Sequence, residues 1–360
     1  MPRPPHRRLA GGGAVRLERY RSRGDRNLKW LRPLLSGLAL LLVVALLSSA
    51  FYVGYARWRF DQIAKPRLAG LTPRVAGRPF DVLFVGAVPE ASPTATTAGG
   101  ARAEAVIVAR IVPSSGEMAL LSIPTDTVVQ PSHGRATLPA QTIDRVLESG
   151  PETLLQTVER DFHLPLSDYV AVDLGALPGL VAALGGLSLH VPYALHDTNA
   201  GLSVDATGCV RLDGEQAAAL LASRNLLYYD RQAGGWQNDE GGASSAAARA
   251  NGVFAALSAR LGGLTTSPGG LFATLGALPA SLVVDPSITE SALYELGRAL
   301  AAGAGAARAT VLPTSATANG AAARPATAKD RAVLSAFLAF GSASSPPLPA
   351  SAAAFDPVPC

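Results

Sequence analysis

The sequence predicts one α/β domain of about 260 residues, preceded by a single transmembrane helix. Short apolar runs bounded by turn residues alternate with segments of helical period, which is typical of an α/β fold. A run of 23 residues without a charge precedes them. With 48% hydrophobic and 16% charged residues the chain is not wholly disordered, and two cysteines exclude a disulfide scaffold.

The uncharged run Leu34–Ala56 is long enough to span a membrane as a helix. At 1.5 Å per residue it would extend about 34 Å, against a hydrocarbon core of about 30 Å. Phe51, Tyr52 and Tyr55 stand at one end, where aromatic rings favour the interface. A cleaved signal peptide or a buried core helix is the alternative, although the apolar region of a signal is usually shorter. We therefore expect a transmembrane helix over residues 33–57.

The positive charge of the chain is concentrated before this helix. Residues 1–32 contain ten basic and two acidic residues, a net charge of +8. The whole chain carries +4, so residues 33–360 sum to −4. The positive-inside rule places the basic tail in the cytoplasm and the rest outside, although the tail could also bind a partner or anionic lipid. A mildly acidic body does not support nucleic-acid binding, so we expect no such partner.

The exterior part begins with a stalk over residues 58–78, which proline and glycine interrupt. A short apolar run that ends in glycine then predicts a buried strand, and a loop rich in Ser, Thr and Pro follows it at residues 87–101. The next two apolar runs are joined by four turn residues, a spacing that predicts a hairpin. The three predicted strands are Pro79–Gly86, Ala105–Val112 and Met118–Ile123.

Helical and extended segments alternate through the remainder of the domain. The period of Leu154, Leu155 and Val158 predicts the first helix. Helices are predicted at Pro151–Phe162, Leu177–Leu184, Asp213–Asn225, Ala246–Leu261, Thr289–Ala302 and Ala328–Phe340, strands at Tyr169–Leu174, Leu187–Val191, Ala280–Val284 and Ala309–Leu312, and a polar glycine-rich loop at residues 230–245. The domain then covers residues 79–340. Residues 341–360, rich in Pro, Ser and Ala, predict a disordered tail.

Five separated segments carry a family resemblance because they occur together in one order. They read RAE from Arg102, LSIPTDT from Leu121, DYVAVD from Asp168, ALGGL from Ala183 and LDGEQA from Leu212. In this order they resemble the motifs of the LytR-CpsA-Psr family, and the resemblance extends over about residues 80–257. An anchor at the amino terminus before an exterior domain is also the layout of that family.

The resemblance implies a fold and a function. The fold is an α/β/α sandwich with a mixed central sheet and an apolar tunnel for a prenyl chain. The function is that of a single-pass cell-membrane phosphotransferase, with its main domain outside the cytoplasm. Such proteins move a glycopolymer from a polyprenyl pyrophosphate carrier onto peptidoglycan. The implied partners are therefore a polyprenyl-linked glycopolymer, peptidoglycan and the lipid bilayer.

The resemblance also implies residue roles. Asp126 and Arg224 match catalytic positions, and Arg102, Arg224 and Arg249 match positions that bind phosphate. Asp126 and Glu104 match the positions that hold Mg²⁺, or Mn²⁺ in its place. These residue types suit the chemistry, because pyrophosphate favours bidentate guanidinium groups and hard cations favour carboxylate oxygens.

Several positions depart from the family pattern. Thr125, Ala222 and Ala243 stand where the family has arginine, and Glu104 replaces an aspartate. Because one charge-stabilising donor is worth about 3 kcal/mol, such losses could leave little turnover. Two hypotheses remain: an active enzyme, in which Arg110, Arg135 or Arg145 compensates, and a degenerate member that binds polyprenyl phosphate or envelope partners without turnover. A structural or signalling protein with an unrelated domain ranks last.

Each matched residue also has an ordinary structural explanation. Asp126 could cap a turn, and Arg224 and Arg249 could be surface charges of helices. The two cysteines present a similar choice. Members of the family with high-GC genomes often form a disulfide at the position of Cys209, but the other cysteine here, Cys360, lies in the tail predicted to be disordered. The sequence leaves this disulfide open.

Overall fold

The computed structural model describes residues 28–89, 100–133, 136–263, 268–303, 307–316, 323–325, 328–342, 346–349 and 358–360. The chain forms two compact units, residues 1–55 and residues 56–360. The basic tail up to residue 27 and the candidate Arg135 lie outside the described residues.

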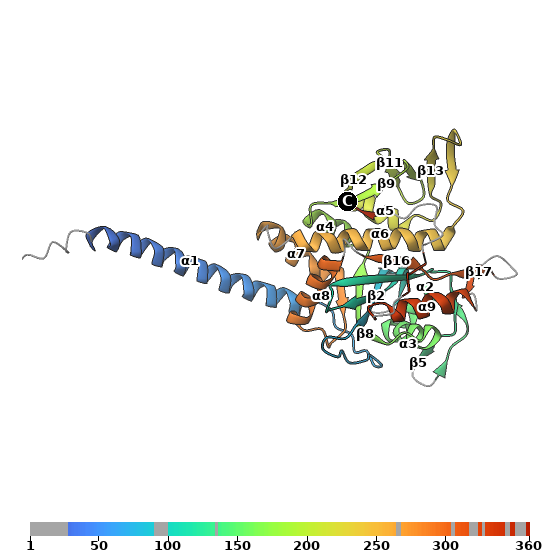
Figure 1. Ribbon diagram of the computed structural model, residues 1–360, viewed down its shortest axis with the longest axis horizontal. Coiled ribbons are helices and arrows are strands. Elements are labelled where there is room, and N and C mark those ends of the chain that lie inside the picture. Colours follow the sequence, from blue (N-terminus) through green and yellow to red (C-terminus); the bar gives the residue numbers. More distant parts are fainter. Residues whose placement is uncertain are drawn as a thin grey trace, which may run out of the picture. The chain divides into compact units, whose positions relative to one another are not determined.

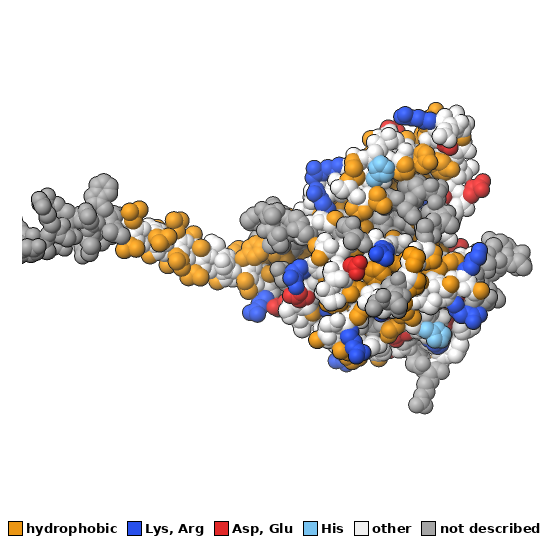
Figure 2. All heavy atoms as spheres, viewed as in Figure 1, with side chains coloured by type: hydrophobic (Ala, Val, Ile, Leu, Met, Phe, Trp, Pro, Cys, Tyr) orange, Lys and Arg blue, Asp and Glu red, His pale blue; other side chains and the backbone are white. Residues whose placement is uncertain are grey.

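Helix α1 (Leu28–Asp61) contains the predicted membrane segment. Within Leu34–Asp61, a window of 18 residues has a mean hydropathy of 2.5, and none of that window is buried. Hydrophobic side chains cover its visible surface (Figure 2). Among the described residues it is the one helix whose length and composition allow it to cross a membrane. It also runs into the predicted stalk as far as Asp61, because no proline or glycine interrupts residues 57–61.

A six-stranded mixed sheet lies at the centre of the second unit, in the order β15-β8-β1-β2-β3-β16 (Figure 1). β2 pairs antiparallel with β1 on one side and with β3 on the other, and the pairing of β2 with β3 confirms the predicted hairpin. By contrast, β8 lies parallel to β1, and β16 lies parallel to β3. The strands are β1 (Phe80–Pro89), β2 (Ala101–Val112), β3 (Glu117–Ile123), β8 (Leu166–Asp173), β15 (Leu282–Val284) and β16 (Arg308–Val311).

Helices cover both faces of this sheet and make three layers. Alternate residues of β1 point to opposite faces, so Leu83 and Val85 belong to one hydrophobic cluster, and Val82 and Phe84 to the other. The first cluster includes α2 (Ile143–Val146), α3 (Pro151–Phe162) and α9 (Lys329–Ala339); the second includes α4 (Leu177–Ala183), α5 (Gly214–Ala222), α6 (Gly242–Gly263), α7 (Pro268–Ser281) and α8 (Glu290–Gly303). The predicted α/β/α arrangement is confirmed. The sequence did not predict α7.

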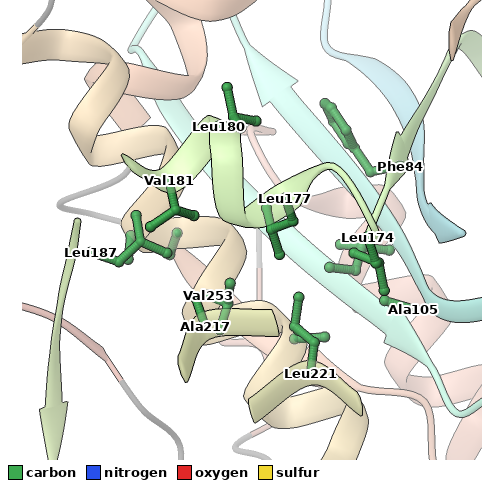
Figure 3. Packing of buried hydrophobic residues seen from close by; sticks show 14 of the residues in the cluster. Phe84, Ala105, Leu174, Leu177, Leu180, Val181, Leu187, Ala217, Leu221 and Val253 are labelled. Carbon is green, nitrogen blue, oxygen red and sulfur yellow. The ribbon is translucent and has the colours of Figure 1, made fainter. Parts of the chain in front are cut away.

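Helices α4, α5 and α6 close the second face over an apolar layer. Leu177 and Val181 of α4 face Leu221 of α5 and Val253 of α6, and all four are buried (Figure 3). The short distance between α4 and α5 depends on Gly214 of the LDGEQA segment. A Cβ atom there would lie 2.3 Å from the carbonyl oxygen of Pro178, so any other residue would push the helices apart.

Two smaller sheets stand beside the central one. One has the order β11-β10-β13-β14 and the other β12-β9-β19. The hairpin of β13 and β14 corrects the prediction of a loop over residues 230–245. Its strands have only four residues each, too few for a clear alternating pattern. The strands are β9 (Leu187–Val191), β10 (Leu195–Asp197), β11 (Leu202–Val204), β12 (Gly208–Leu212), β13 (Leu227–Asp230), β14 (Gly235–Asn238) and β19 (Val358–Pro359).

Short two-stranded pairs complete the fold. β4 (Val128–Val129) pairs with β7 (Gln141–Thr142), β5 (Ser132–His133) with β6 (Ala136–Thr137), and β17 (Thr314–Ala316) with β18 (Ala323–Pro325). A 3₁₀ turn, Leu147–Ser149, joins α2 to α3.

A disulfide between Cys209 and Cys360 fixes the end of the chain. Residues Val358–Pro359 pair with β9, and the amide of Cys360 donates to the carbonyl of Ser188 at 3.3 Å. The prediction of disorder over residues 341–360 is therefore wrong for these last three residues. A covalent bond and backbone pairing supply the order that the Pro/Ser/Ala composition does not.

A buried ion pair in the sheet predicts a pH dependence of stability. Asp81, which is 1% exposed, accepts from Nη1 of Arg110 at 2.9 Å. Burial outweighs the arginine and raises the pKa of Asp81 to about 6. The folded protein therefore holds this proton more tightly than the unfolded chain does. The resulting stabilisation is complete below the ordinary pKa near 4 and is lost as the pH rises through about 6.

We expect Asp81→Asn to remove this dependence. Between pH 4 and pH 6.5 the wild type should lose about 2 kcal/mol of unfolding free energy relative to the variant. Urea unfolding of the full chain in detergent at several pH values measures the difference. Parallel curves for the two proteins would show that Asp81 does not titrate in this range.

Candidate functional site

A polar cleft opens where the loops after the central strands meet the start of α6. It encloses about 340 Å³, and nine residues line it: Arg102, Glu104, Thr125, Asp126, Thr142, Asp144, Arg224, Gly242 and Ala243. Four of the five residues proposed from the sequence meet here, namely Arg102, Glu104, Asp126 and Arg224. Their roles remain predictions, whereas their proximity is a property of the fold.

Backbone pairing holds the two acidic loops of the cleft together. Thr125 and Asp126 follow β3 after one intervening residue, Pro124, and Asp144 lies in the first turn of α2. The amide of Ile143 donates to the carbonyl of Thr127 at 2.9 Å, and the amide of Asp144 donates to that of Thr125 at 3.2 Å. The separation of Asp126 from Asp144 is thus set by main-chain hydrogen bonds.

Strand β2 and the segment after α5 contribute the other charged side chains of the cleft. Arg102 and Glu104 are two residues apart on β2, so both point to the same face. Arg224 forms an ion pair with Glu104, and its Nη1 donates to Oγ1 of Thr125 at 3.1 Å. Arg102 pairs with Glu148 at 3.1 Å and approaches Asp144 at 3.9 Å. Carboxylates therefore balance both arginines of the cleft.

Asp126 and Asp144 offer free carboxylate oxygens. Oδ1 of each is buried and has no hydrogen-bond partner. Burial raises the pKa of Asp126, and the charge of Asp144 raises it further, against the opposing effect of Arg224. Unpaired buried carboxylate oxygens are costly, and a cation between them would remove that cost. The observed donor set therefore fits a hard cation.

The pair of unsatisfied acids, Asp126 and Asp144, differs from the expected pair of metal ligands, Asp126 and Glu104. Glu104, proposed as a metal ligand, is paired with Arg224, whereas Asp144 was not proposed at all. In the sequence Asp144 is simply an acid in the first turn of a short helix, a pattern that helix ends commonly show. Within the described residues no group of three or more His, Cys, Asp or Glu side chains could hold a metal ion. Further ligands would have to come from water or substrate, as is usual for Mg²⁺.

Arg249 does not reach the cleft. Its side chain is 2% exposed, forms an ion pair with Asp239 at 2.5 Å and donates to the carbonyl of Ser223 at 2.8 Å. Burial lowers the pKa of its guanidinium group, and the nearby Arg224 adds to the effect. This placement does not support the proposed phosphate contact. Arg249 instead joins α6 to the residue that precedes Arg224.

The positions that depart from the family pattern also have clear places. Gly242 and Ala243 line the cleft at the first turn of α6, and Ala222 is exposed at the end of α5. Of the arginines considered as replacements, Arg110 and Arg145 are described, and neither is among the residues that line the cleft; Arg110 is paired with Asp81. The cleft therefore has two arginines from the described part of the chain.

Comparison with known sequences agrees with the motifs. Residues 60–230 match the model of the LytR_cpsA_psr family. The chain is 28% identical over 203 residues to the polyisoprenyl-teichoic acid–peptidoglycan teichoic acid transferase TagV of Bacillus subtilis. The aligned residues make up 53% of this chain and 50% of that protein. It is 31% identical over 128 residues to TagU of Oceanobacillus iheyensis, over 34% of this chain and 38% of that protein. The chain thus matches half or less of these relatives.

Comparison with solved structures concerns the fold. A LytR-Csp2A-Psr enzyme from Actinomyces oris superposes with a TM-score of 0.61 at 21% identity, over 76% of this chain and 95% of that one. B. subtilis TagV superposes with a TM-score of 0.56 at 19% identity, over 73% and 97%. The ordered motifs, the family match and the shared fold lead to one conclusion: residues 60–230 carry a domain of the LytR-CpsA-Psr family.

Proposed function

We propose that this chain is a membrane-anchored phosphotransferase that moves a glycopolymer from a polyprenyl pyrophosphate carrier to peptidoglycan. One observation carries the proposal: Arg102, Arg224, Asp126 and Asp144 line a single cleft. Two guanidinium groups beside two partly unsatisfied carboxylates suit a pyrophosphate accompanied by a divalent cation. The transferase names of the relatives support the same class of reaction.

Each group of the cleft then has a chemical task. Arg224 and Arg102 bind oxygens of the pyrophosphate, and for this Arg224 exchanges Glu104 for the ligand. Oδ1 of Asp126 and Oδ1 of Asp144 hold Mg²⁺ or Mn²⁺. When bound, the ion would neutralise charge that develops on the transferred phosphoryl group. Positioning and charge stabilisation account for most catalysis of this kind, so these residues can suffice.

The start of α6 supplies a further attraction for phosphate. Gly242 and Ala243 line the cleft, and the first amides of a helix have no acceptor within the helix. The dipole of a helix of 22 residues also places partial positive charge at this end. Small side chains leave these amides accessible. These helix amides compensate in part for the loss of the positive charge of the family arginine at position 243, where this chain has Ala243.

The membrane anchor and the apolar layer support a lipid-linked donor. Helix α1 can span a bilayer, and the basic tail before it favours a cytoplasmic amino terminus, with the domain outside. Ala105, next to Glu104 of the cleft, packs in the apolar layer with Leu174 and Leu221 (Figure 3). These side chains are buried, so a prenyl chain whose pyrophosphate occupies the cleft would reach the layer only if α4 and α5 moved apart.

A member that binds without turnover is the second candidate. Two observations favour it: Thr125 stands at the position of a family arginine, and Glu104 already neutralises Arg224. Such a protein would retain polyprenyl phosphates but transfer nothing.

Turnover of a labelled substrate separates the two candidates. The full chain in detergent is incubated with a labelled prenyl-pyrophosphate oligosaccharide, Mg²⁺ and peptidoglycan fragments. Labelled peptidoglycan and released prenyl phosphate are expected, and chelation of the cation should stop both. Retention of the lipid with neither product would reject the transferase and establish the second candidate.

Restoring the missing arginine should strengthen phosphate binding. Thr125 lines the cleft beside Arg224, so the side chain of Thr125→Arg would add a third guanidinium group to the cleft. A charge-assisted hydrogen bond predicts an affinity for inorganic pyrophosphate about tenfold higher, measured by calorimetry. Ser114→Arg adds the same charge to the exposed turn between β2 and β3 and should change nothing. Equal affinity in both variants would contradict the proposed position of the phosphates.

A further inference from the structure

The sheet β11-β10-β13-β14 exposes aromatic side chains on its outer face. The register of its strands places six residues on that face, which we call the aromatic face: His196, Ser203, Leu227, Tyr229, Trp236 and Asn238. Trp236 is 47% exposed and Tyr229 is 39% exposed. In Figure 1 the hairpin of β13 and β14 stands at the amino-terminal end of α6.

Within the described part of the domain, this outer face is not a packing surface. The opposite side of the same sheet buries Leu195, Leu202 and Val204 in the core. The sheet is therefore already anchored through its inner face, and alternation would normally place polar residues outside. Large exposed aromatic side chains that do not contribute to the core often mark a binding surface.

The rings form a connected platform with polar neighbours. The ring centroids of Tyr229 and Trp236 are 5.5 Å apart at an angle of 73°, and those of Trp236 and His196 are 6.0 Å apart. Nε2 of His196 lies 3.2 Å from Oγ1 of Thr198, which orients the imidazole. Ser203 and Asn238 add a hydroxyl and an amide at the margins of the rings. The six residues include no Lys, Arg, Asp or Glu.

We propose that the aromatic face binds an uncharged glycan strand, of the β-linked N-acetylhexosamine type. The apolar C–H side of a pyranose packs on an aromatic ring, while its hydroxyl and acetamido groups need neutral donors and acceptors at the ring margins. A single-stranded nucleic acid would need several cations beside the rings, and none of the six residues of the face is a cation. Two exposed rings among polar residues also make a narrow strip, smaller than the apolar centre of a stable protein interface.

The aromatic face is connected rigidly to the cleft. β13 begins three residues after Arg224, and β14 ends one residue before Asp239, the partner of Arg249. Asp197 of β10 is 1% exposed and accepts from Oγ of Ser223 at 2.6 Å and from the amide of Asn225 at 3.0 Å, on both sides of Arg224. A strand held on the rings would thus have a fixed position relative to the cleft. The role of the aromatic face as the site that binds the peptidoglycan acceptor rests on the proposed function. The binding of a glycan to this face does not depend on it.

Binding is tested without donor lipid or cation. The full chain in detergent carries Trp30→Phe and Trp58→Phe, so that Trp236 is the only tryptophan. Titration with chitotetraose should change its fluorescence saturably. In the chain with native Trp30 and Trp58, calorimetry should show affinity about tenfold weaker for Trp236→Ala and nearly native for Trp236→Phe. Trp58→Ala, an exposed tryptophan on α1, is the matched control and should bind normally.

The outcomes distinguish this proposal from the proposed function. Loss of binding in Trp236→Ala and in Tyr229→Ala, with unchanged thermal unfolding, supports a glycan platform even if the protein transfers nothing. Absence of saturable binding in the parent chain, or equal affinity in Trp236→Ala, overturns it. A Trp236→Ala variant that binds sugar normally but loses self-association would assign the face to a protein partner and would also overturn it.

Discussion

Asp126→Asn is expected to lower cation-dependent transfer at least about 100-fold, because it removes one of two carboxylates that face the same space. Asparagine keeps the size of the side chain but cannot balance the charge of a divalent ion. Because burial raises the pKa of Asp126, the change removes an unfavourably placed charge, and the fold should not lose stability. Binding of Mn²⁺, followed by electron paramagnetic resonance, should weaken in parallel with turnover.

The same measurements on two further variants locate the cation. Asp144→Asn should show a similar loss of Mn²⁺ affinity, since its Oδ1 has the same unsatisfied state. Glu295→Gln removes an acid from the exposed surface of α8 and should leave both affinity and turnover unchanged. Full turnover in Asp126→Asn with native Mn²⁺ affinity would mean that the ion binds elsewhere and that Asp126 only shapes the loop after β3.

Arg249→Met is expected to destabilise the folded domain by about 3–5 kcal/mol. It leaves the carboxylate of Asp239, which is 4% exposed, without its partner, and a lone buried charge is far costlier than a buried pair. The carbonyl of Ser223 also loses a donor at 2.8 Å. Urea unfolding of the full chain in detergent, monitored by circular dichroism, measures the change.

A double variant isolates the role of this pair. Arg249→Met combined with Asp239→Leu removes both charges and should recover most of the lost stability. Arg298→Met, which breaks an exposed pair on α8, should cost no more than about 0.5 kcal/mol. If Arg249→Met kept its stability but lost affinity for pyrophosphate, the sequence-based role of Arg249 in phosphate binding would be correct.

The position of Arg249 also shows where a motif match has limits. The match placed an arginine at the start of a helix but said nothing about the side of the helix that it occupies. Helix α6 already extends over Gly242–Gly263, so Arg249 lies two turns in, on the side that packs against α5. The acid that determines its surroundings, Asp239, follows a hairpin that the sequence pattern did not reveal.

The hairpin itself shows a second limit. Glycines at positions 234 and 235 and strands of four residues predict a loop by composition. The pairing of Tyr229 with Trp236 is a contact between β13 and β14. The stability that it adds depends on β10, which pairs with β13. Short strands are stabilised by their neighbours more than by their own residues.

Local physical chemistry determined much of this protein from its sequence alone. The uncharged run, the helix Pro151–Phe162, the hairpin of β2 and β3 and the ordered family motifs depend on neighbouring residues or on composition, so they could be predicted. Tertiary structure decided which charges meet. The pairing of Glu104 with Arg224, the approach of Asp144 to Asp126 and the burial of Arg249 join residues 10 to 120 positions apart. Such distances are set by the packing of the sheet and its helices, which no local pattern encodes.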